Sequence, residues 1–251
     1  MNDELELLKK RFAELSRTAE SSLYYTFTDF LGLAEQSALS DVKRDLASKY
    51  TVFGGAEGAE RVMVRFGDPG EIGYEVDFPI VCLKISPRAP KFADKLTHRD
   101  FLGALLNLGI ERSVLGDIII INNEGFLFAK DSIADFIASD LTRVKHTDVR
   151  VVRAESLPEG ELYKTERRRI QAQGERLDAV IAKLFSLSRE KASALFAKRL
   201  VFASGRQIES ISYNPKVGEV ISVRGYGRFV YLGYESLSKK GKKNIEVDLY
   251  V

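Results

Sequence analysis

The chain has 251 residues, enough for two or three small domains with cores of their own. Its 45% hydrophobic and 29% charged residues are ordinary for a soluble globular protein, and no run of about 18 apolar residues could span a bilayer. The single cysteine, Cys82, excludes an internal disulfide framework, and the charged start of the chain indicates no signal peptide. We therefore expect a cytoplasmic protein.

Residues 1–75 are predicted to form a subdomain of helices followed by strands. Apolar residues recur at helical spacing over residues 2–17, and two further helices are expected at 28–35 and 40–49. From residue 51 glycine-rich turns separate β-branched and aromatic stretches, which predict strands at 51–54 and 60–66.

Residues 76–160 are predicted to form an α+β domain. The elements expected in chain order are a strand at 74–85, a helix at 97–106, a β-hairpin over 116–130, a helix at 132–141 and a strand at 148–154. Thr97 is the expected N-cap of the first helix, and Asn122 and Asn123 open the turn of the hairpin. Helices layered on an antiparallel or mixed sheet give an α/β sandwich that we expect to be RRM-like.

A polar stretch at 155–174 is predicted to link this region to a third domain, residues 170–251. The charge changes sign there. Residues 164–251 hold 18 Lys and Arg against 9 Asp and Glu, whereas residues 1–163 hold 20 against 27. A basic third on an acidic body is typical of a domain that binds a polyanion, although a solvated basic face would carry the same charge.

The basic third begins with two predicted amphipathic helices. Leu177, Val180, Ile181 and Leu184 form one apolar stripe, and Ser188 is a suitable N-cap for the second helix. Short strands and turns follow. Such a unit brings cations together with the free amides of a helix N-terminus, which favours phosphate binding.

The pattern R-L-D at 176–178, S-R at 188–189, a Ser204-Gly205 turn and V-G-E-V-I-S-V-R-G at 217–225 resembles the S4 RNA-binding domain. The resemblance covers residues 173–227 and implies the alpha-L RNA-binding fold, which is found in a ribosomal protein, pseudouridine synthases and tyrosyl-tRNA synthetases. The chain departs from the family at two positions, with Arg199 in place of a glycine and Ser204 in place of an asparagine.

The stretch from Thr97 to Ile119 resembles the YlmH-type proteins, also called the second RqcP-like family, which carry an RNA-binding region followed by S4. With this stretch the resemblance spans nearly the whole chain. It implies an α+β protein with a C-terminal S4 domain. Strands expected at 229–234 and 245–250, with the basic residues 239–243 between them, predict a β-hairpin at the end of that domain. The resemblance also implies a role in ribosome-associated quality control of stalled nascent chains, on the large subunit with peptidyl-tRNA; older naming links the family to cell division.

On this interpretation the basic third supplies the RNA contacts: Arg176, Ser188, Arg189, Lys191, Lys198, Arg199, Arg206, Arg224 and Arg228. Weaker candidates are Arg99, Arg112, Arg167, Arg168, Lys240 and Lys242. The expected partners are structured RNA (rRNA or tRNA), read through backbone and shape, and the large ribosomal subunit. We expect a monomer without a cofactor or a metal.

Catalytic motifs are incomplete in the sequence. His98-Arg99-Asp100 matches the kinase catalytic-loop triplet, but Leu105 stands where that loop needs asparagine. Asp178 matches an aspartate of pseudouridine synthases, but the residues after it continue an amphipathic helix, so we interpret it as a charge that stabilises the helix start. We therefore expect a non-catalytic RNA-binding protein. Two alternatives stay open: an RNA-modifying enzyme that uses S4 for docking, and a protein-interaction adaptor linked to cell division.

Overall fold

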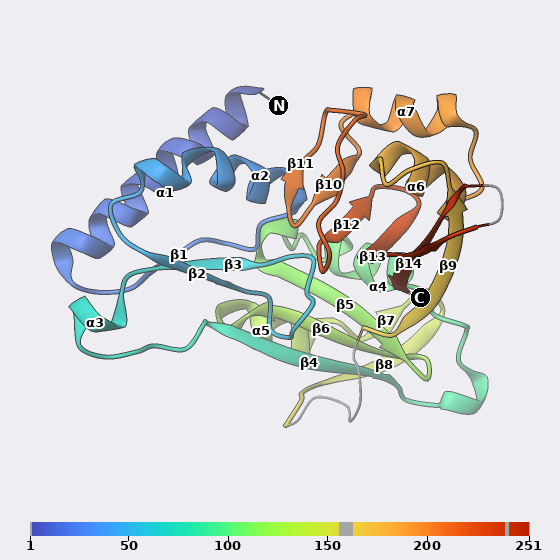
Figure 1. The fold of residues 1–251 in the computed structure, drawn as a ribbon. Coiled ribbons are helices and arrows are strands. Elements are labelled where there is room, and N and C mark those ends of the chain that lie inside the picture. The colour runs from blue at the N-terminus through green and yellow to red at the C-terminus, as the bar shows by residue number, and fades with distance from the viewer. Residues whose placement is uncertain (1, 156–162, 239–240, 251) are drawn as a thin grey trace. The chain divides into compact units, whose positions relative to one another are not determined.

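The computed structural model describes residues 2–155, 163–238 and 241–250. The chain divides into two compact units, Met1–Leu162 and Tyr163–Val251, which are described separately below (Figure 1). Among the described residues, no helix is both long and apolar enough to cross a membrane.

The first part of the N-terminal unit is a three-stranded antiparallel sheet with helices on one face. Its elements are α1 (Asn2–Ser22), β1 (Thr26–Phe27), α2 (Leu33–Val42), η1 (Lys43–Asp45), β2 (Tyr50–Phe53), β3 (Met63–Phe66) and α3 (Pro69–Ile72), with strand order β1-β3-β2. Phe12 and Leu15 of α1 pack with Leu39 of α2 against Val64 and Phe66 of β3. The amphipathic face of α1 is therefore buried on this small sheet.

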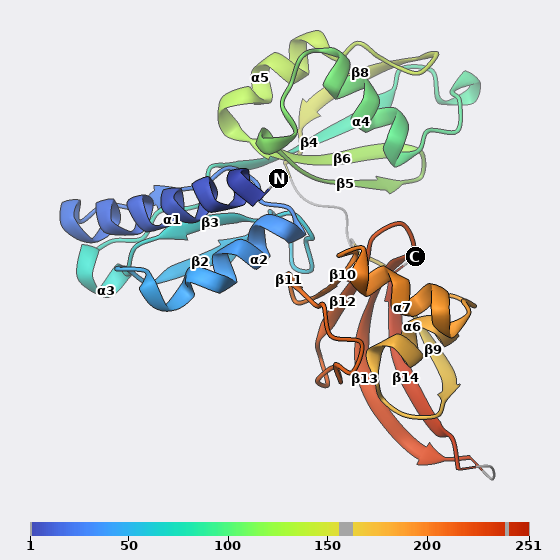
Figure 2. The ribbon, with the colours of Figure 1, turned by 90° about the horizontal axis from the view of Figure 1, so that it is seen from above.

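The second part of this unit is a five-stranded antiparallel sheet. Its elements are β4 (Ile80–Pro87), η2 (Pro90–Phe92), α4 (His98–Asn107), η3 (Arg112–Val114), β5 (Leu115–Ile121), β6 (Glu124–Lys130), α5 (Asp131–Asp140), β7 (Arg143–Val144) and β8 (Thr147–Arg153), with strand order β5-β6-β4-β8-β7. The chain order β4-α4-β5-β6-α5-β8 places β6 and β4 in the centre, which is the split β-α-β arrangement of ferredoxin-like folds. Helices α4 and α5 lie on one face of the sheet (Figure 2).

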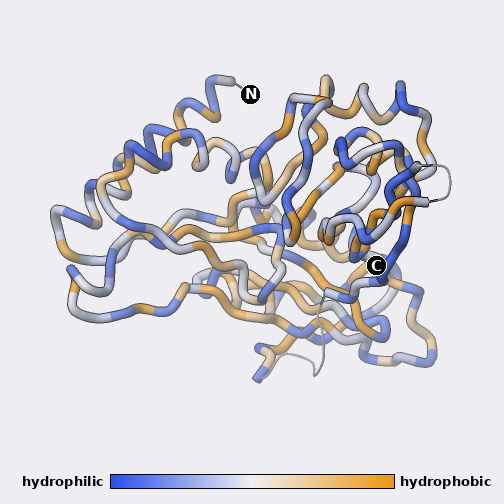
Figure 3. The backbone as a smooth tube through the Cα atoms, in the orientation of Figure 1, coloured by the Kyte–Doolittle hydropathy of each residue, from blue (hydrophilic) through white to orange (hydrophobic). Residues whose placement is uncertain are grey.

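Period-two alternation explains which side of the sheet is the core. Leu83 of β4 pairs with Leu127 of β6 and with Arg153 of β8. Leu83 and Leu127 are fully buried against Phe101 and Leu105 of α4, and Lys84, which alternates with Leu83 and Ile85, is only half-buried on the other face, whereas Arg153 is exposed at the end of β8. Apolar residues accordingly concentrate along these strands, whereas many residues of α1 are hydrophilic (Figure 3).

A half-buried arginine, Arg61, joins the two parts of this unit. Arg61 donates from Nε to the carbonyl of Leu115 (2.8 Å) and from Nη2 to the carbonyls of Phe30 (2.8 Å) and Arg112 (3.0 Å). The Asp117 carboxylate accepts the backbone amides of Glu60 (2.7 Å) and Arg61 (3.1 Å). Because these bonds connect segments far apart in sequence, the small sheet is fixed to the larger one.

The C-terminal unit has a single six-stranded antiparallel sheet covered by two helices. Its elements are β9 (Thr165–Ala172), α6 (Leu177–Leu184), α7 (Arg189–Ala197), β10 (Val201–Ala203), β11 (Arg206–Gln207), β12 (Val220–Val223), β13 (Gly227–Leu237) and β14 (Lys243–Tyr250), with strand order β11-β10-β12-β13-β14-β9. The core combines Ile181, Leu195 and Phe196 of the helices with Phe229 and Val247 of the sheet.

The expected fold class is confirmed at the level of an α+β protein with separate antiparallel sheets. Several expected element bounds were wrong. The helix expected at 28–35 begins at Leu33, because residues 26–27 pair with β3 and Thr28 accepts the backbone amide of Val64 through its Oγ1 (2.9 Å). The helix expected at 40–49 is instead the end of α2 followed by η1. The predicted linker contains β9, an edge strand that pairs with β14 over its whole length.

Candidate RNA-binding face on helices α6 and α7

Helix α6 buries more than the apolar stripe that the sequence predicts. Leu177, Val180 and Ile181 are fully buried as expected, and Asp178 in the first turn is also only 1% exposed. Removing a charged carboxylate from water costs several kcal/mol, so a buried carboxylate is normally surrounded by cations or hydrogen-bond donors. We therefore expect Asp178 to have cationic partners.

Two arginines bind Asp178 from the solvent side. Arg176, the residue before α6, lies 3.2 Å from Oδ1 through Nε and 3.2 Å from Oδ2 through Nη2. Arg189, the first residue of α7, donates from Nη2 to Oδ2 at 2.5 Å. The arginine side chains stay 46% and 51% exposed. A buried anion thus fixes two guanidinium groups side by side at the surface, with donors left over for an incoming anion.

The same arginines flank the N-terminus of α7. Ser188 is the N-cap, as predicted, and its Oγ accepts the backbone amide of Lys191 at 3.2 Å. The side chains of Arg189 and Lys191 are exposed in the first turn. We call Arg176, Arg189 and Lys191 with this helix start the α7 face. All three cations lie in or next to the first turn of α7, where the positive end of the helix dipole also favours a phosphate group.

A second group of cations surrounds the C-terminal end of α7. Lys198 is the C-cap, and Arg199 follows it with a φ of 57°. This left-handed conformation explains why a glycine is expected there in the family the chain resembles. The Arg199 Nε lies 3.4 Å from Glu209, and Arg224 stacks 5.1 Å from the ring centroid of Phe202.

Other candidates of the C-terminal unit are engaged within the fold. Arg228 lies 3.9 Å from the ring centroid of Tyr250. Arg167 pairs with Asp248 (2.6 Å) and Glu246 (3.3 Å), and Arg168 pairs with Glu166. These ion pairs run along the exposed edge strand β9, where charged side chains also discourage pairing with another chain.

Three candidates of the C-terminal unit remain. Arg206 is exposed on the short strand β11, Lys242 is half-buried beside the turn after β13, and Lys240 lies outside the described residues.

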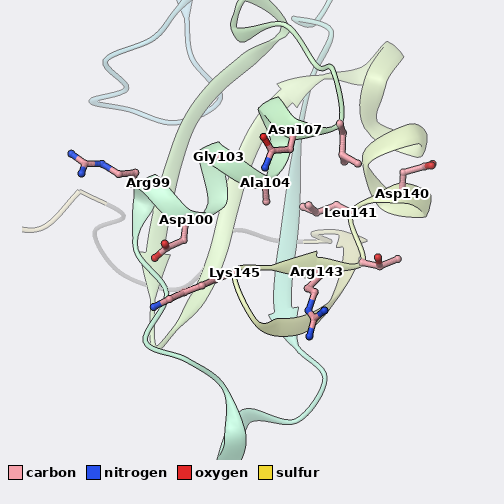
Figure 4. Close-up of a pocket in the computed structure, with 11 residues that line it drawn as sticks. Arg99, Asp100, Gly103, Ala104, Asn107, Asp140, Leu141, Arg143 and Lys145 are labelled. Atoms are coloured by element: carbon pink, nitrogen blue, oxygen red, sulfur yellow. The ribbon is translucent and has the colours of Figure 1, made fainter.

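The two candidates in the N-terminal unit have different environments. Arg112 donates from Nη1 to the carbonyls of Leu115 (2.8 Å) and Gly116 (2.9 Å), and burial lowers the pKa of its guanidinium to about 10. Its hydrogen bonds therefore serve the fold. Arg99 is exposed on α4 and lines an open hollow of about 490 Å³ together with Arg143 and Lys145, which the sequence analysis did not single out (Figure 4).

Asp178 is the residue that sequence reasoning missed. We interpreted it as a charge at a helix start, whereas it holds two of the predicted RNA-binding arginines. The available signal was the R-x-D pattern with a second arginine eleven residues after the aspartate.

The described residues contain no group of three or more His, Cys, Asp or Glu that could hold a metal ion. Burial raises the pKa of the Cys82 thiol to about 11, which keeps it protonated at neutral pH.

The chain is similar to a known family, to a curated protein and to a solved structure. The family model described as "Putative RNA-binding domain in YlmH" matches residues 74–157. The "Ribosome-associated protein quality control protein P2" of Bacillus subtilis (strain 168) is 29% identical over 236 residues, which cover 91% of this chain and 89% of the relative. The structure of "Cell division protein ylmH from Streptococcus pneumoniae" aligns with a TM-score of 0.48 and 20% identity, over 60% of this chain and 91% of that one. The family match and the full-length relative confirm the resemblance of this chain to the YlmH-type proteins.

Proposed function

We propose that the chain is a non-catalytic protein that binds structured RNA of the large ribosomal subunit, rRNA or tRNA, and acts in ribosome-associated quality control. The observation that carries this proposal is the buried Asp178, which holds Arg176 and Arg189 at the start of α7. A surplus of nine positive charges over residues 164–251 supports it. The Bacillus subtilis relative is named for ribosome-associated protein quality control.

In this proposal the C-terminal unit is an S4 domain, with α6 and α7 as the helical pair that receives RNA. The positive φ at Arg199 and at Ser204 supports it, because the S4 pattern has glycine and asparagine at these two positions, residues that adopt this conformation most readily. The N-terminal unit then contributes an RRM-like domain, as its β4-α4-β5-β6-α5-β8 order suggests.

Recognition would act mainly through the phosphate backbone. Arginine binds phosphate oxygens in a bidentate manner, and the Asp178 anchor reduces the side-chain entropy that each arginine loses on binding. Binding through several phosphate contacts must weaken steeply as salt rises, because condensed counterions are released from RNA. Shape and backbone readout suits folded rRNA or tRNA better than a sequence motif.

The test is co-sedimentation with purified large subunits. Arg189→Glu with Lys191→Glu reverses two exposed charges on the α7 face and should abolish co-sedimentation at physiological salt. Lys43→Glu with Arg44→Glu makes the same change of net charge on exposed residues of η1 in the other unit and should leave binding nearly unchanged. Equal binding by both double variants would refute the assignment of the α7 face.

A further inference from the structure

The sheet face that RRM proteins use for RNA is covered in this chain. In those proteins aromatic side chains on the open face of the sheet stack on bases. The corresponding residues of β6, Phe126 and Phe128, are only 5% and 1% exposed. Gly55 of the β2–β3 loop lies so close to Phe128 that a Cβ atom there would be 2.2 Å from the ring. Bases therefore cannot stack on this face while the N-terminal sheet is in place.

A different surface of the same domain is open. The loop between β4 and α4 meets the turn between β7 and β8 at one end of the sheet. The backbone amide of Asp94 donates to Thr147 Oγ1 (2.9 Å), and that of Arg88 donates to the carbonyl of Asp148 (2.9 Å). Asn123 fixes the loop by donating to the carbonyl of Asp94 and accepting from the amide of Leu96, each at 2.8 Å. These hydrogen bonds fix the conformation of the loop that carries the surface.

This end of the sheet is basic although its surroundings are acidic. Residues 87–100 and 141–150 hold seven Lys and Arg against three Asp and Glu, whereas the rest of residues 1–163 holds 13 against 24. The three acids are engaged: Asp94 with His146 (3.5 Å), Asp148 with Arg143 (3.6 Å) and Asp100 with Thr97 Oγ1 (2.6 Å). A local positive field on an acidic body attracts a polyanion to this surface.

An exposed aromatic ring lies in the same loop as two of these lysines, Lys91 and Lys95. Phe92 is 85% exposed, the most exposed of the large apolar side chains described, and Lys91 Nζ lies 5.9 Å from its ring centroid. Lys145 extends from the β7–β8 turn toward Asp100 at the start of α4, and Arg99 points outward from α4 (Figure 4). We call Lys91, Phe92, Lys95, Arg99, Arg143 and Lys145 the loop-end surface.

We propose that the loop-end surface binds single-stranded RNA, with Phe92 stacked on a base, Lys91 on the adjacent phosphate, and the other cations of the surface on phosphates further along the strand. The pairing of an exposed ring with lysines and arginines is how proteins hold single strands without reading their sequence. This proposal rests on the RNA-binding function proposed above and adds to it a second contact in the N-terminal unit, for an unpaired segment.

The chain contains no tryptophan, so Phe92→Trp introduces a single fluorescent reporter at the proposed stacking position. Adding a short oligouridine at low salt should quench this fluorescence, whereas inorganic polyphosphate, which has charge but no bases, should not. Phe136→Trp places the reporter on α5, at a ring that is 41% exposed, and should remain unquenched. Oligouridine binding detected by anisotropy without a change at position 92 would overturn the proposal, as would equal quenching by polyphosphate or an absence of binding.

A second measurement gives the magnitude. Phe92→Ala should lower the affinity for labelled oligouridine roughly tenfold, because stacking on one base contributes that much. Phe92→Trp should restore it. An unchanged affinity of Phe92→Ala would contradict the stacking role, and the exposure of this ring makes a folding defect an unsuitable explanation for a loss.

One experiment distinguishes failure of the loop-end surface from failure of the α7 face. In a chain that also carries Arg189→Glu and Lys191→Glu, the fluorescence of Trp at position 92 should still be quenched by oligouridine. Quenching that persists while these two changes leave subunit binding intact would support the loop-end surface and refute the α7 face. If the variant instead loses subunit binding and shows no quenching at position 92, the α7 face is supported and the loop-end surface is refuted.

Discussion

The Oδ2 atom of Asp178, a carboxylate only 1% exposed, accepts a 2.5 Å hydrogen bond from Nη2 of Arg189 on the next helix. Arg176 binds the same carboxylate from the preceding turn. The pairing connects the start of α6 to the start of α7 and fixes the arginines that we propose as RNA contacts. One ion-pair cluster therefore affects both the stability of the helical pair and its binding surface.

Removing both arginines should destabilise the helical pair far more than removing either one. Arg176→Met or Arg189→Met leaves Asp178 one partner, whereas the double variant leaves a buried carboxylate without a cation, at a cost of about 3 kcal/mol. Hydrogen exchange of the α6 amides measures this local free energy. Strictly additive effects of the two substitutions would show that Asp178 does not need these arginines.

A half-buried carboxylate, Glu175, gives a pH dependence. Glu175 accepts from Tyr231 Oη (2.6 Å) and Lys243 Nζ (2.5 Å), and these bonds, the one from Lys243 above all, lower its pKa. A carboxylate with a lowered folded-state pKa adds stability above its unfolded pKa of roughly 4.3, and this stability is lost as the pH falls through the folded value.

Glu175→Gln should therefore unfold more readily than the unchanged chain at neutral pH, and the difference should shrink in acid below the unfolded pKa. Thermal unfolding followed across that range tests this. A difference in melting temperature that stays constant with pH would mean that the glutamate charge is not responsible.

The close packing of Gly55 on Phe128 predicts a large effect of a single methyl group. Gly55→Ala adds a Cβ into the ring at a position with φ 97°, so we expect a loss of more than about 2 kcal/mol and looser attachment of the β2–β3 loop. Gly109→Ala is the matched control. It has φ 77° but nothing within 4 Å of the added Cβ, so only the backbone term of about 1 kcal/mol applies. Equal losses in urea unfolding would show that the contact with Phe128 does not matter.

The sequence predicted those elements whose apolar residues follow one period. The stripe of α6, the N-cap Ser188 and the Asn122-Asn123 turn were all found in this way, and both asparagines have the positive φ that such a turn requires. Strand β9 was missed because it is an edge strand with charged residues on successive positions, so no alternation marks it. Its arginines Arg167 and Arg169 bind the acids Asp248 and Glu246 of β14, and that pairing depends on tertiary structure.

The candidate site was predictable in composition but not in geometry. A list of cations could be read from the basic third, yet the R-x-D pattern does not by itself show that Asp178 is buried, because its second arginine, Arg189, lies eleven residues further along the chain. The structure also separates cations that looked equivalent: Arg189 faces solvent beside a helix N-terminus, whereas Arg112 donates to backbone carbonyls inside the N-terminal unit. The hollow lined by Arg99, Arg143 and Lys145 joins segments about 40 residues apart, which periodicity does not connect.

The salt dependence of RNA affinity tests the central claim most directly. The affinity of the full chain for large-subunit RNA should fall linearly with the logarithm of the salt concentration, and Arg189→Gln with Lys191→Gln should reduce that slope by about one to two units, because each lost phosphate contact removes roughly one released counterion. Lys43→Gln with Arg44→Gln should leave the slope unchanged. An identical slope and affinity for the chain with and without the α7-face substitutions would contradict the account.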